Sequence, residues 1–514
     1  MGVKMFAAID VGSYMLHLKV FEFLPSNVMK EVDSVRYGID LGTETFATGK
    51  LSSAKVAELC KVLSDFAGIM KSYGVTQYVA YGTSAIRETT NTNVLLDLIE
   101  QRTGIKIDIL SNSRQRFLTY KSVASIGEDF NKIIQKGTAI LDIGGGSIQL
   151  SVFENDTLVA TQNMKLGVLR LQERLHVLTS VNAKYEMLLD EMIDSQFELF
   201  KKLYLKDRQI ENMIIVDDHV SNLLQNGMLG GEKAGYIDDE AYEQFHNALW
   251  NDSMFDKQRR YGLDEESVAK LQISAALIRK AVKLTNANLI WAPGISMCDG
   301  MAFEYGEDHR LLKRNHDFEE DIIACAKNIS KRYMGSVKRE QTLETITMQI
   351  FDSLKKKSGL VTRDRLLLRI AAILHDCGKY ISLYNLADCS YNIIMSTEII
   401  GLSHEEREIV ANVVKFNHME FDSYENVAGE QFISGEQYLR IAKLTAILRV
   451  ANGLDRSHKQ KFKNIKASVK DKEFIITVHT DKDITLEKGL LKERANFFEE
   501  VFFLKPVIMQ QKGR

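Results

Sequence analysis

Residues 8–13 read Ala-Ile-Asp-Val-Gly-Ser, and residues 141–147 read Leu-Asp-Ile-Gly-Gly-Gly-Ser. Phe21 follows Asp10 by eleven residues, and Phe153 follows Asp142 by the same eleven, with apolar residues at matching positions between. The alternation around each stretch predicts a strand, a tight turn and a second strand. An internal repeat of this kind predicts two related half-domains that face each other across a cleft.

The two turns have the composition of a phosphate site. Three glycines, Gly144 to Gly146, let the backbone approach an anion so that several N–H groups converge on it. Glycine-rich hairpin turns also occur without a ligand. The aspartate before the turn, the serine after it and the second copy at residues 10–13 favour a phosphate chain held with Mg²⁺.

The bulk composition is that of an ordinary globular protein. The chain has 514 residues, 45% of them hydrophobic and 26% charged, which predicts three or four domains. A net charge of −3 gives no indication of a nucleic-acid partner. Five cysteines without CxxC spacing indicate a reducing compartment. With no apolar run of 18 residues and no signal peptide, we expect a cytoplasmic protein without membrane contact.

The pattern changes twice along the chain. Strands and helices alternate up to about residue 305, and residues 318–455 then carry helical apolar stripes throughout. Strand alternation returns at residues 465–469 and 473–479, and a helix and a last strand are predicted after it. The sequence leaves the oligomeric state open, a homodimer included.

Several stretches resemble the exopolyphosphatase/guanosine pentaphosphate phosphatase family (Ppx/GppA), which has the actin-like ATPase fold. They are residues 9–13, 83–88, 142–147 and 166–171, followed in the helical region by residues 340–341, 347–349 and 371–375. The resemblance covers nearly the whole chain. It implies an α/β protein with two ribonuclease-H-like, actin-like half-domains at 1–125 and 126–305. An all-α HD-like domain at 315–457 and a small α+β domain at 458–514 follow.

In such enzymes, the resemblance implies, both turns grip terminal phosphates, Mg²⁺ bridges them, and water attacks the end of the chain. The metal ligands would be Asp10 and Asp142. The phosphate-binding residues would be Gly12, Ser13, Thr83, Ser84, Arg87, Gly144, Gly145, Gly146 and Ser147. Two alternatives stay open: Arg87 as part of a salt bridge, and Thr83 and Ser84 as a helix cap.

The sequence departs from the family at the general base. A Ser-Gly-x-Glu-Glu-Ala-Arg stretch supplies that glutamate in the family, whereas residues 111–117 read Ser-Asn-Ser-Arg-Gln-Arg-Phe here. The glutamate position falls at Arg114 or Gln115, and neither side chain accepts a proton from water. Loss of a general base typically costs about 100- to 10,000-fold in rate. Glu88 is a candidate for a relocated base, although the sequence does not place it.

Two further departures lie near the predicted cleft. The family's Gly-Gly-Thr loop is replaced by Asp217, Asp218 and His219, whose two carboxylates would repel phosphate unless a metal intervenes. The family's Asn-Ser after the first turn is replaced by Tyr14 and Met15, which adds bulk.

The helical region resembles a metal-dependent phosphohydrolase domain named for its His-Asp pair. His375 and Asp376 match that pair, and Asp455 matches a ligand on the closing helix. Where the resemblance requires an upstream histidine, the chain has Arg339. We therefore expect a helical scaffold that keeps the fold and not the metal.

Lysines gather near the C-terminal strands, at Lys459, Lys461, Lys463 and Lys466. On an acidic chain such a run predicts a track for a long polyanion, and a solvated surface is the alternative.

The leading prediction is an exopolyphosphatase-like phosphohydrolase that releases terminal phosphate from inorganic polyphosphate or a related phosphoanhydride such as guanosine pentaphosphate. The alternative is a catalytically impaired regulatory protein that binds polyphosphate or a guanosine polyphosphate, which the missing glutamate favours. Neither prediction involves a specific nucleic acid. A kinase-like ATPase is a weaker third reading, because the Gly-Gly-Thr loop is missing.

Overall fold

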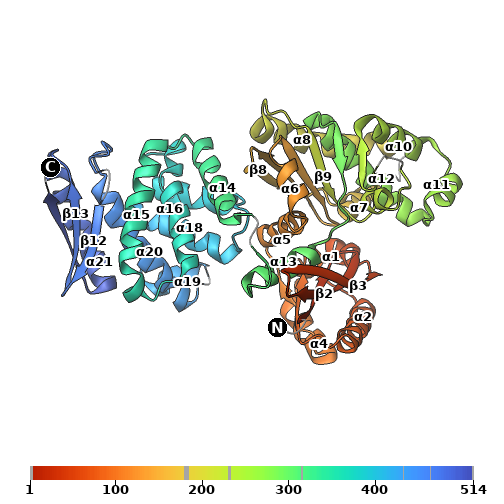
Figure 1. Cartoon of the computed structure of the whole chain (residues 1–514), viewed down its shortest axis with the longest axis horizontal. Coiled ribbons are helices and arrows are strands. Elements are labelled where there is room, and N and C mark those ends of the chain that lie inside the picture. The colour runs from red at the N-terminus through yellow and green to blue at the C-terminus, as the bar shows by residue number, and fades with distance from the viewer. Residues whose placement is uncertain are drawn as a thin grey trace. The chain divides into compact units, whose positions relative to one another are not determined.

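The computed structural model describes residues 4–178, 185–229, 233–313, 316–431, 433–462 and 465–511. The chain divides into two compact units, Met1–Asp317 and Phe318–Arg514 (Figure 1). Within the described ranges, no helix combines the length and the apolar character that a bilayer crossing requires.

The first unit contains two mixed sheets of related topology. The strands of the first sheet, in spatial order, are β3 (Val28–Gly38), β2 (Met15–Leu24), β1 (Lys4–Val11), β4 (Gln77–Gly82) and β5 (Asp108–Ile109). Those of the second are β10 (Tyr236–Asp238), β11 (Leu289–Trp291), β9 (Asn212–Val216), β6 (Thr138–Ile143), β7 (Ile148–Glu154) and β8 (Thr157–Met164).

The predicted repeat is present in three dimensions. In both sheets an antiparallel three-stranded meander is extended by parallel strands next to its first strand. Asp10 pairs with His17 across the first hairpin, and Asp142 pairs with Gln149 across the second. The two aspartates therefore occupy the same register position in two copies of one unit, and the α/β, actin-like fold class is confirmed.

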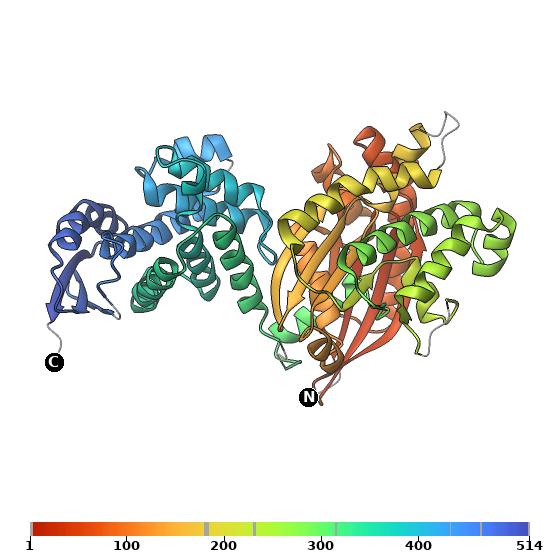
Figure 2. The same cartoon turned by 90° about the horizontal axis from the view of Figure 1, so that it is seen from above.

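The helices of this unit connect and cover the sheets. They are α1 (Gly42–Thr48), α2 (Ser53–Ser72), α3 (Ser84–Arg87), α4 (Thr92–Thr103), α5 (Asn112–Ala124), α6 (Glu128–Ile133), α7 (Val168–Leu178), α8 (Tyr185–Phe200), α9 (Val220–Gln225), α10 (Asp239–Asn251), α11 (Met254–Tyr261), α12 (Glu265–Thr285) and α13 (Met297–Asp308). A π-helix at Lys201–Leu205 continues α8. The yellow and green helices lie along the second sheet in Figure 2.

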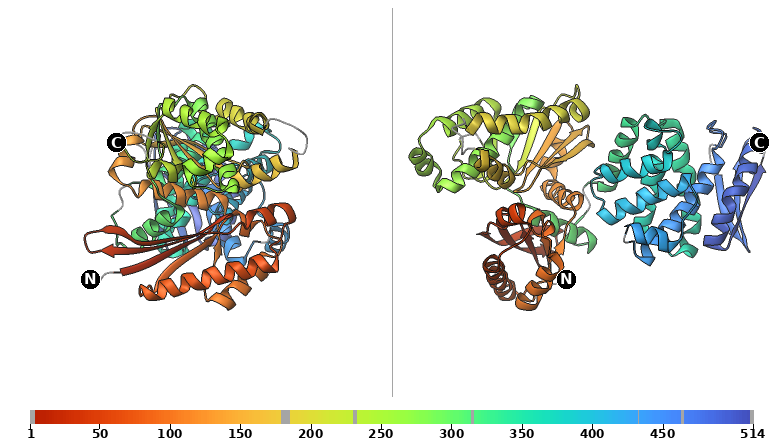
Figure 3. Two further views of the ribbon diagram at one scale, coloured as in Figure 1. Left: turned by 90° about the vertical axis from the view of Figure 1, so that its right-hand side faces the viewer. Right: turned by 180° about the vertical axis from the view of Figure 1, so that it is seen from behind.

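Alternation along β1 sends side chains to two cores. Ile9 and Val11 pack with α2 and α4, which lie against one face of the first sheet (Figure 3). Phe6 and Ala8 face the other way and pack with α5 and α13. Helix α13 thus packs on the first sheet, although the sequence groups residues up to 305 with the second half-domain. The chain returns to the first sheet because the apolar face of α13 completes that core.

The second unit is helical and ends in a small sheet. Its helices are α14 (Phe318–Arg332), α15 (Val337–Ser358), α16 (Thr362–Leu374), a 3₁₀ turn (Cys377–Tyr380), α17 (Leu386–Ser396), α18 (His404–His418), α19 (Tyr424–Gln431), α20 (Gly435–Leu454) and α21 (Thr485–Phe502). The strands are β12 (Ile465–Lys470), β13 (Glu473–His479) and β14 (Lys505–Gln511). Because α21 packs on α20 and β12 packs on α15, the helical and α+β parts form one compact unit.

Candidate functional site

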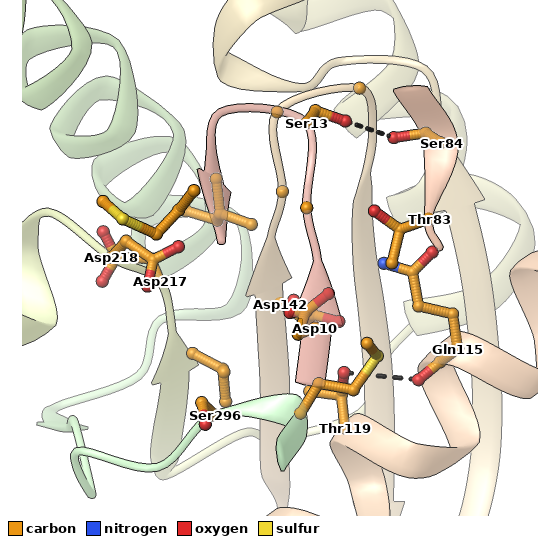
Figure 4. Close-up of a pocket in the computed structure, with 18 of the residues that line it drawn as sticks. Asp10, Ser13, Thr83, Ser84, Gln115, Thr119, Asp142, Asp217, Asp218 and Ser296 are labelled. Carbon is orange, nitrogen blue, oxygen red and sulfur yellow. Dashed lines mark hydrogen bonds between the residues drawn. The ribbon is translucent and has the colours of Figure 1, made fainter. Parts of the chain in front are cut away.

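A cavity lies between the two half-domains of the first unit, where the hairpin turns face each other (Figure 4). Its lining includes residues 12–15 and 142–147, together with Asp10 and side chains from α5. The cavity has a volume of about 90 Å³, whereas pockets that hold small ligands measure about 300–1,000 Å³. The cleft is therefore narrow in this structure.

The two turns are built alike. The N–H of Gly12 donates to the carbonyl of Met15, and the N–H of Gly144 donates to the carbonyl of Ser147, both at 3.0 Å. Met15 is consequently the structural counterpart of Ser147. The hydroxyl at the end of the turn, which is predicted to contact phosphate, occurs only in the second copy of the turn.

The turns also touch each other across the cleft. Within the first half-domain, Ser13 and Ser84 share a hydrogen bond of 2.8 Å between their hydroxyls. A Cβ on Gly145 would lie 3.0 Å from the Cβ of Ser13, and a Cβ on Gly146 would lie 2.8 Å from the Ser84 hydroxyl. These two glycines are thus required by the close approach of the half-domains, in addition to any role toward an anion.

Arg116 of α5 is the one cation that lines the cavity among the described residues. Its side chain is buried, with a residue exposure of 3%. Nη1 donates to Oδ2 of Asp142 at 2.5 Å, and Nη2 donates to the hydroxyl and carbonyl of Ser147 at 2.6 and 3.2 Å. The guanidinium therefore binds both a predicted metal ligand and a predicted phosphate donor.

Sequence reasoning missed Arg116. The signal that could have found it is a polar stripe on α5, because Arg116 and Thr119 are three residues apart and share a helix face. Both line the cavity, together with Gln115.

Asp10 and Asp142 lie together at the floor of the cleft (Figure 4). Burial and the nearby charges of Asp218 and Asp142 raise the pKa of Asp10 to about 8. The raised pKa reflects the cluster of carboxylates, Asp10, Asp142 and Asp218, that burial in the narrow cleft brings together.

The donors present do not fit the expected Mg²⁺ site. One oxygen of Asp142 is already bound by Arg116. Mg²⁺ is usually held by one or two carboxylates together with substrate phosphates, so the guanidinium on Asp142, and not the number of ligands, is what disfavours the metal here. Mg²⁺ at Asp10 and Asp142 stays a prediction that this arrangement does not favour.

Of the two candidate positions for the family glutamate, Gln115 lies at the cleft and Arg114 does not. Gln115 lines the cavity, and its side chain extends beside Thr83 in Figure 4. Arg114 instead forms a two-pronged ion pair with Glu304 of α13, with Nη1 donating to Oε1 at 2.9 Å. Of the two candidate positions for the general base, the one that lines the cavity carries an amide.

Asp217 is surrounded by hydrogen-bond donors. Asp217 accepts hydrogen bonds from the N–H groups of residues 219–221 at the start of α9 and from the hydroxyls of Ser221 and Ser274. These donors offset its charge. The repulsion expected from the sequence is reduced in this way.

Tyr14 connects the half-domains at one side of the cleft. Its hydroxyl donates to Oδ2 of Asp218 at 2.6 Å, and its ring stacks on His219 at a centroid distance of 5.3 Å. The bulk that the sequence predicts near the cleft thus serves as a bridge between the two halves.

Two of the candidate residues, Arg87 and Glu88, have partners outside the cavity, whereas Thr83 lies in its lining. Arg87 donates to the carbonyl of Leu110 and to the side chain of Asn112, and it does not line the cavity. Glu88 pairs with Arg170 at 3.0 Å and also lies outside the lining. Thr83 lines the cavity, and its side chain makes no capping hydrogen bond to α3.

The helical unit contains a second arginine–aspartate pair. Arg339 donates from Nη1 to Asp376 and from Nη2 to Asn452, the latter at 3.0 Å. The Nζ of Lys379 and the Nε2 of His375 lie 2.7 and 3.2 Å from the same oxygen, Oδ2 of Asp376. The residue that replaces the expected upstream histidine is therefore bound to the aspartate of the His-Asp pair.

The predicted lysine track is only partly exposed. Lys459 and Lys466 are exposed. Lys461 pairs at 2.7 Å with Glu487, whose side chain is fully buried. Lys463 lies outside the described residues. The polyanion track stays a prediction.

Comparison with protein families gives two matches. The model of the Ppx/GppA phosphatase family matches residues 22–289, and the model of Ppx/GppA phosphatase domain III matches residues 323–495. Together they extend over both compact units.

Curated relatives carry two kinds of name. The chain is 29% identical to "Exopolyphosphatase 1" of Mycobacterium leprae over 164 residues, 32% of this chain and 47% of that protein. The chain thus spans about half the length of that relative. It is 18% identical over 449 residues to a "Guanosine-5'-triphosphate,3'-diphosphate pyrophosphatase" of Photobacterium profundum, with 86% of both chains covered.

Among solved structures, the chain is similar to an exopolyphosphatase from Cytophaga hutchinsonii. The TM-score is 0.51 at 16% identity, covering 60% of this chain and 100% of that one. This similarity concerns the fold alone.

Proposed function

Since the chain belongs to the Ppx/GppA phosphatase family, we propose that its cleft binds the end of an inorganic polyphosphate or guanosine polyphosphate and releases terminal phosphate slowly. Both ligand classes are named by the curated relatives, and both present a chain of phosphates. Hydrolysis of either breaks a phosphoanhydride bond.

One observation carries this proposal: the turn at residues 144–147 and the guanidinium of Arg116 lie together in a cavity between two half-domains. Backbone N–H groups of such a turn and a buried guanidinium are both donors suited to phosphate oxygens. Ser13 and Ser84 add hydroxyls from the opposite half-domain. Because the cavity is narrow, entry of a phosphate chain requires the half-domains to separate.

The proposed chemistry relies on positioning. Water would attack the terminal phosphorus in line with the leaving phosphate, and the charge would spread over the phosphate oxygens. The amide of Gln115 can orient that water without accepting its proton. A rate about 100- to 10,000-fold below that of a glutamate enzyme follows. Because the carboxylates do not fit a metal site as arranged, no step is assigned to Mg²⁺.

A second function is favoured by the same amide. A protein that binds polyphosphate or a guanosine polyphosphate without turnover needs the turn and Arg116, and it does not need a base. Both functions share the binding site and differ in hydrolysis alone.

Phosphate release from long-chain polyphosphate by the full chain separates the two. We expect slow release by the wild type and a rise of at least about tenfold in Gln115→Glu, because the new carboxylate supplies a base in the cleft. Arg114→Glu is the matched control, since this residue pairs with Glu304 outside the cavity. That control should give no increase.

Three results decide the outcome. Release in the wild type that rises in Gln115→Glu supports the enzyme. Binding without release in the wild type and in Gln115→Glu establishes the binding protein instead. A chain that neither binds nor cleaves polyphosphate contradicts both functions.

A further inference from the structure

We propose that the guanidinium of Arg116 occupies the place of a divalent metal in this cleft, so that a phosphate chain binds there without metal. The inference rests on the proposed function in one respect, namely that the cleft receives a phosphate chain. The inference goes further by naming Arg116 as the cation that contacts the phosphate chain.

The first argument comes from the contacts of Arg116. Its Nη1 lies 2.5 Å from the Asp142 carboxylate, and its Nη2 lies 2.6 Å from the Ser147 hydroxyl. The predicted Mg²⁺ would need the Asp142 carboxylate as a ligand. A positive charge is therefore already held at this position, and a second cation beside it would be repelled.

The second argument comes from a donor that remains available. The Nε of Arg116 is buried and has no hydrogen-bond partner among the residues that the structure describes. A buried charged donor without a partner is costly, and a phosphate oxygen would satisfy it. This unpartnered atom belongs to a side chain that lines the cavity.

The third argument is the orientation of the side chain toward the turn. A Cβ on Gly144 would lie only 4.0 Å from Nη2 of Arg116. The guanidinium thus lies against the backbone of the glycine turn, which would supply the other donors to the same anion. Because Asp142 and Ser147 fix the planar group, little conformational freedom is lost when the anion binds.

The experiment measures binding of long-chain inorganic polyphosphate to the full chain by calorimetry, in EDTA and in Mg²⁺ at one salt concentration. We expect the wild-type dissociation constant to agree within about threefold between the two conditions. Arg116→Ala should weaken binding in EDTA by about 10- to 100-fold, the range for a charged hydrogen-bonding group. Mg²⁺ should recover part of that loss, because the change vacates Asp142.

Two further variants guard against trivial effects. Arg116→Lys keeps the charge but not the fork, and we expect it to bind between the wild type and Arg116→Ala. Arg114→Ala removes an arginine that faces Glu304, and we expect wild-type binding. Circular dichroism of each variant verifies folding, and the wild-type comparison in EDTA needs no variant.

Each outcome has a defined meaning. Wild-type binding that appears only with Mg²⁺ overturns this inference and leaves the proposed function intact. Unchanged affinity of a folded Arg116→Ala in EDTA also overturns it. Absence of polyphosphate binding in both conditions removes the proposed function and the inference together.

Discussion

The two compact units each contain a buried arginine–aspartate pair, and the surroundings of the two pairs differ. In each unit an arginine is bound to an aspartate that the family resemblance marks as a metal ligand: Arg116 to Asp142 in the first, Arg339 to Asp376 in the second. Both arginines are buried, with residue exposures of 3% and 5%. The surroundings of the two pairs, however, are not alike.

The pair in the cleft leaves room for a ligand. Arg116 lines a cavity and faces a glycine turn. The pair in the helical unit is enclosed by its own unit. Arg339 also binds Asn452, and Asp376 is approached by Lys379 and His375 as well.

The charge state of Asp376 reflects that enclosure. Burial alone would raise its pKa, but hydrogen bonds and charges from His375, Arg339 and Lys379 hold the pKa below its ordinary value. The aspartate therefore remains ionised and paired. We therefore infer that the Arg116 pair forms an anion site, because a cavity and donors surround it, whereas the Arg339 pair is a structural ion pair, because side chains close around it.

The largest expected effect tests the structural pair. Arg339→Ala should lower the free energy of unfolding of the helical unit by about 3–5 kcal/mol, because it removes one partner of a buried ion pair. Denaturant unfolding followed by circular dichroism measures this change.

The control for this prediction is Arg365→Ala. Arg365 pairs with Asp352, and their side chains are 33% and 51% exposed, so we expect a loss of about 0–1 kcal/mol. Equal losses in the two variants would mean that the Arg339 pair contributes no more than a surface salt bridge.

A further expected effect concerns acid and compares the two units directly. Burial lowers the pKa of His246 in the first unit to about 4, and burial lowers that of His418 in the second to about 4. The ordinary value is about 6.5, so between these values the unfolded chain binds more protons than the folded one. The unfolding free energy of both units should fall as the pH drops from about 6.5 to about 4.

Thermal unfolding across this pH range provides the measurement. His246→Gln keeps an acceptor for Trp250, whose Nε1 donates to His246 at 2.9 Å. It should flatten the pH dependence of the first unit and leave that of the second unchanged. An unaltered slope in the first unit would assign the acid sensitivity to other groups.

Much of the fold follows from the sequence because local patterns specify it. The repeat predicts both hairpins, and the structure confirms them at residues 4–24 and 138–154. The strands predicted at 465–469 and 473–479 are found as β12 and β13. Periodicity does not say which sheet a helix covers, and α13 is the example.

The site was less predictable because its decisive contacts are long-range. Arg116 and Asp142 are 26 residues apart, and Arg339 and Asp376 are 37 apart. Gln115 and Arg114 could be told apart only from the packing of α5, which places Gln115 at the cavity and Arg114 on Glu304 of α13. The sequence of α5 alone does not show which of its sides faces the cleft.

Polyphosphate affinity of Asp142→Asn, measured in EDTA and in Mg²⁺, tests the central claim most directly. Asparagine keeps an oxygen for Arg116 and removes a negative charge next to the anion, so we predict binding several-fold tighter than in the wild type. If Asp142 instead holds a metal that binds the phosphates, the same change should weaken Mg²⁺-dependent binding by roughly tenfold or more. A loss of that size would contradict the assignment of Arg116 as the cation of this cleft.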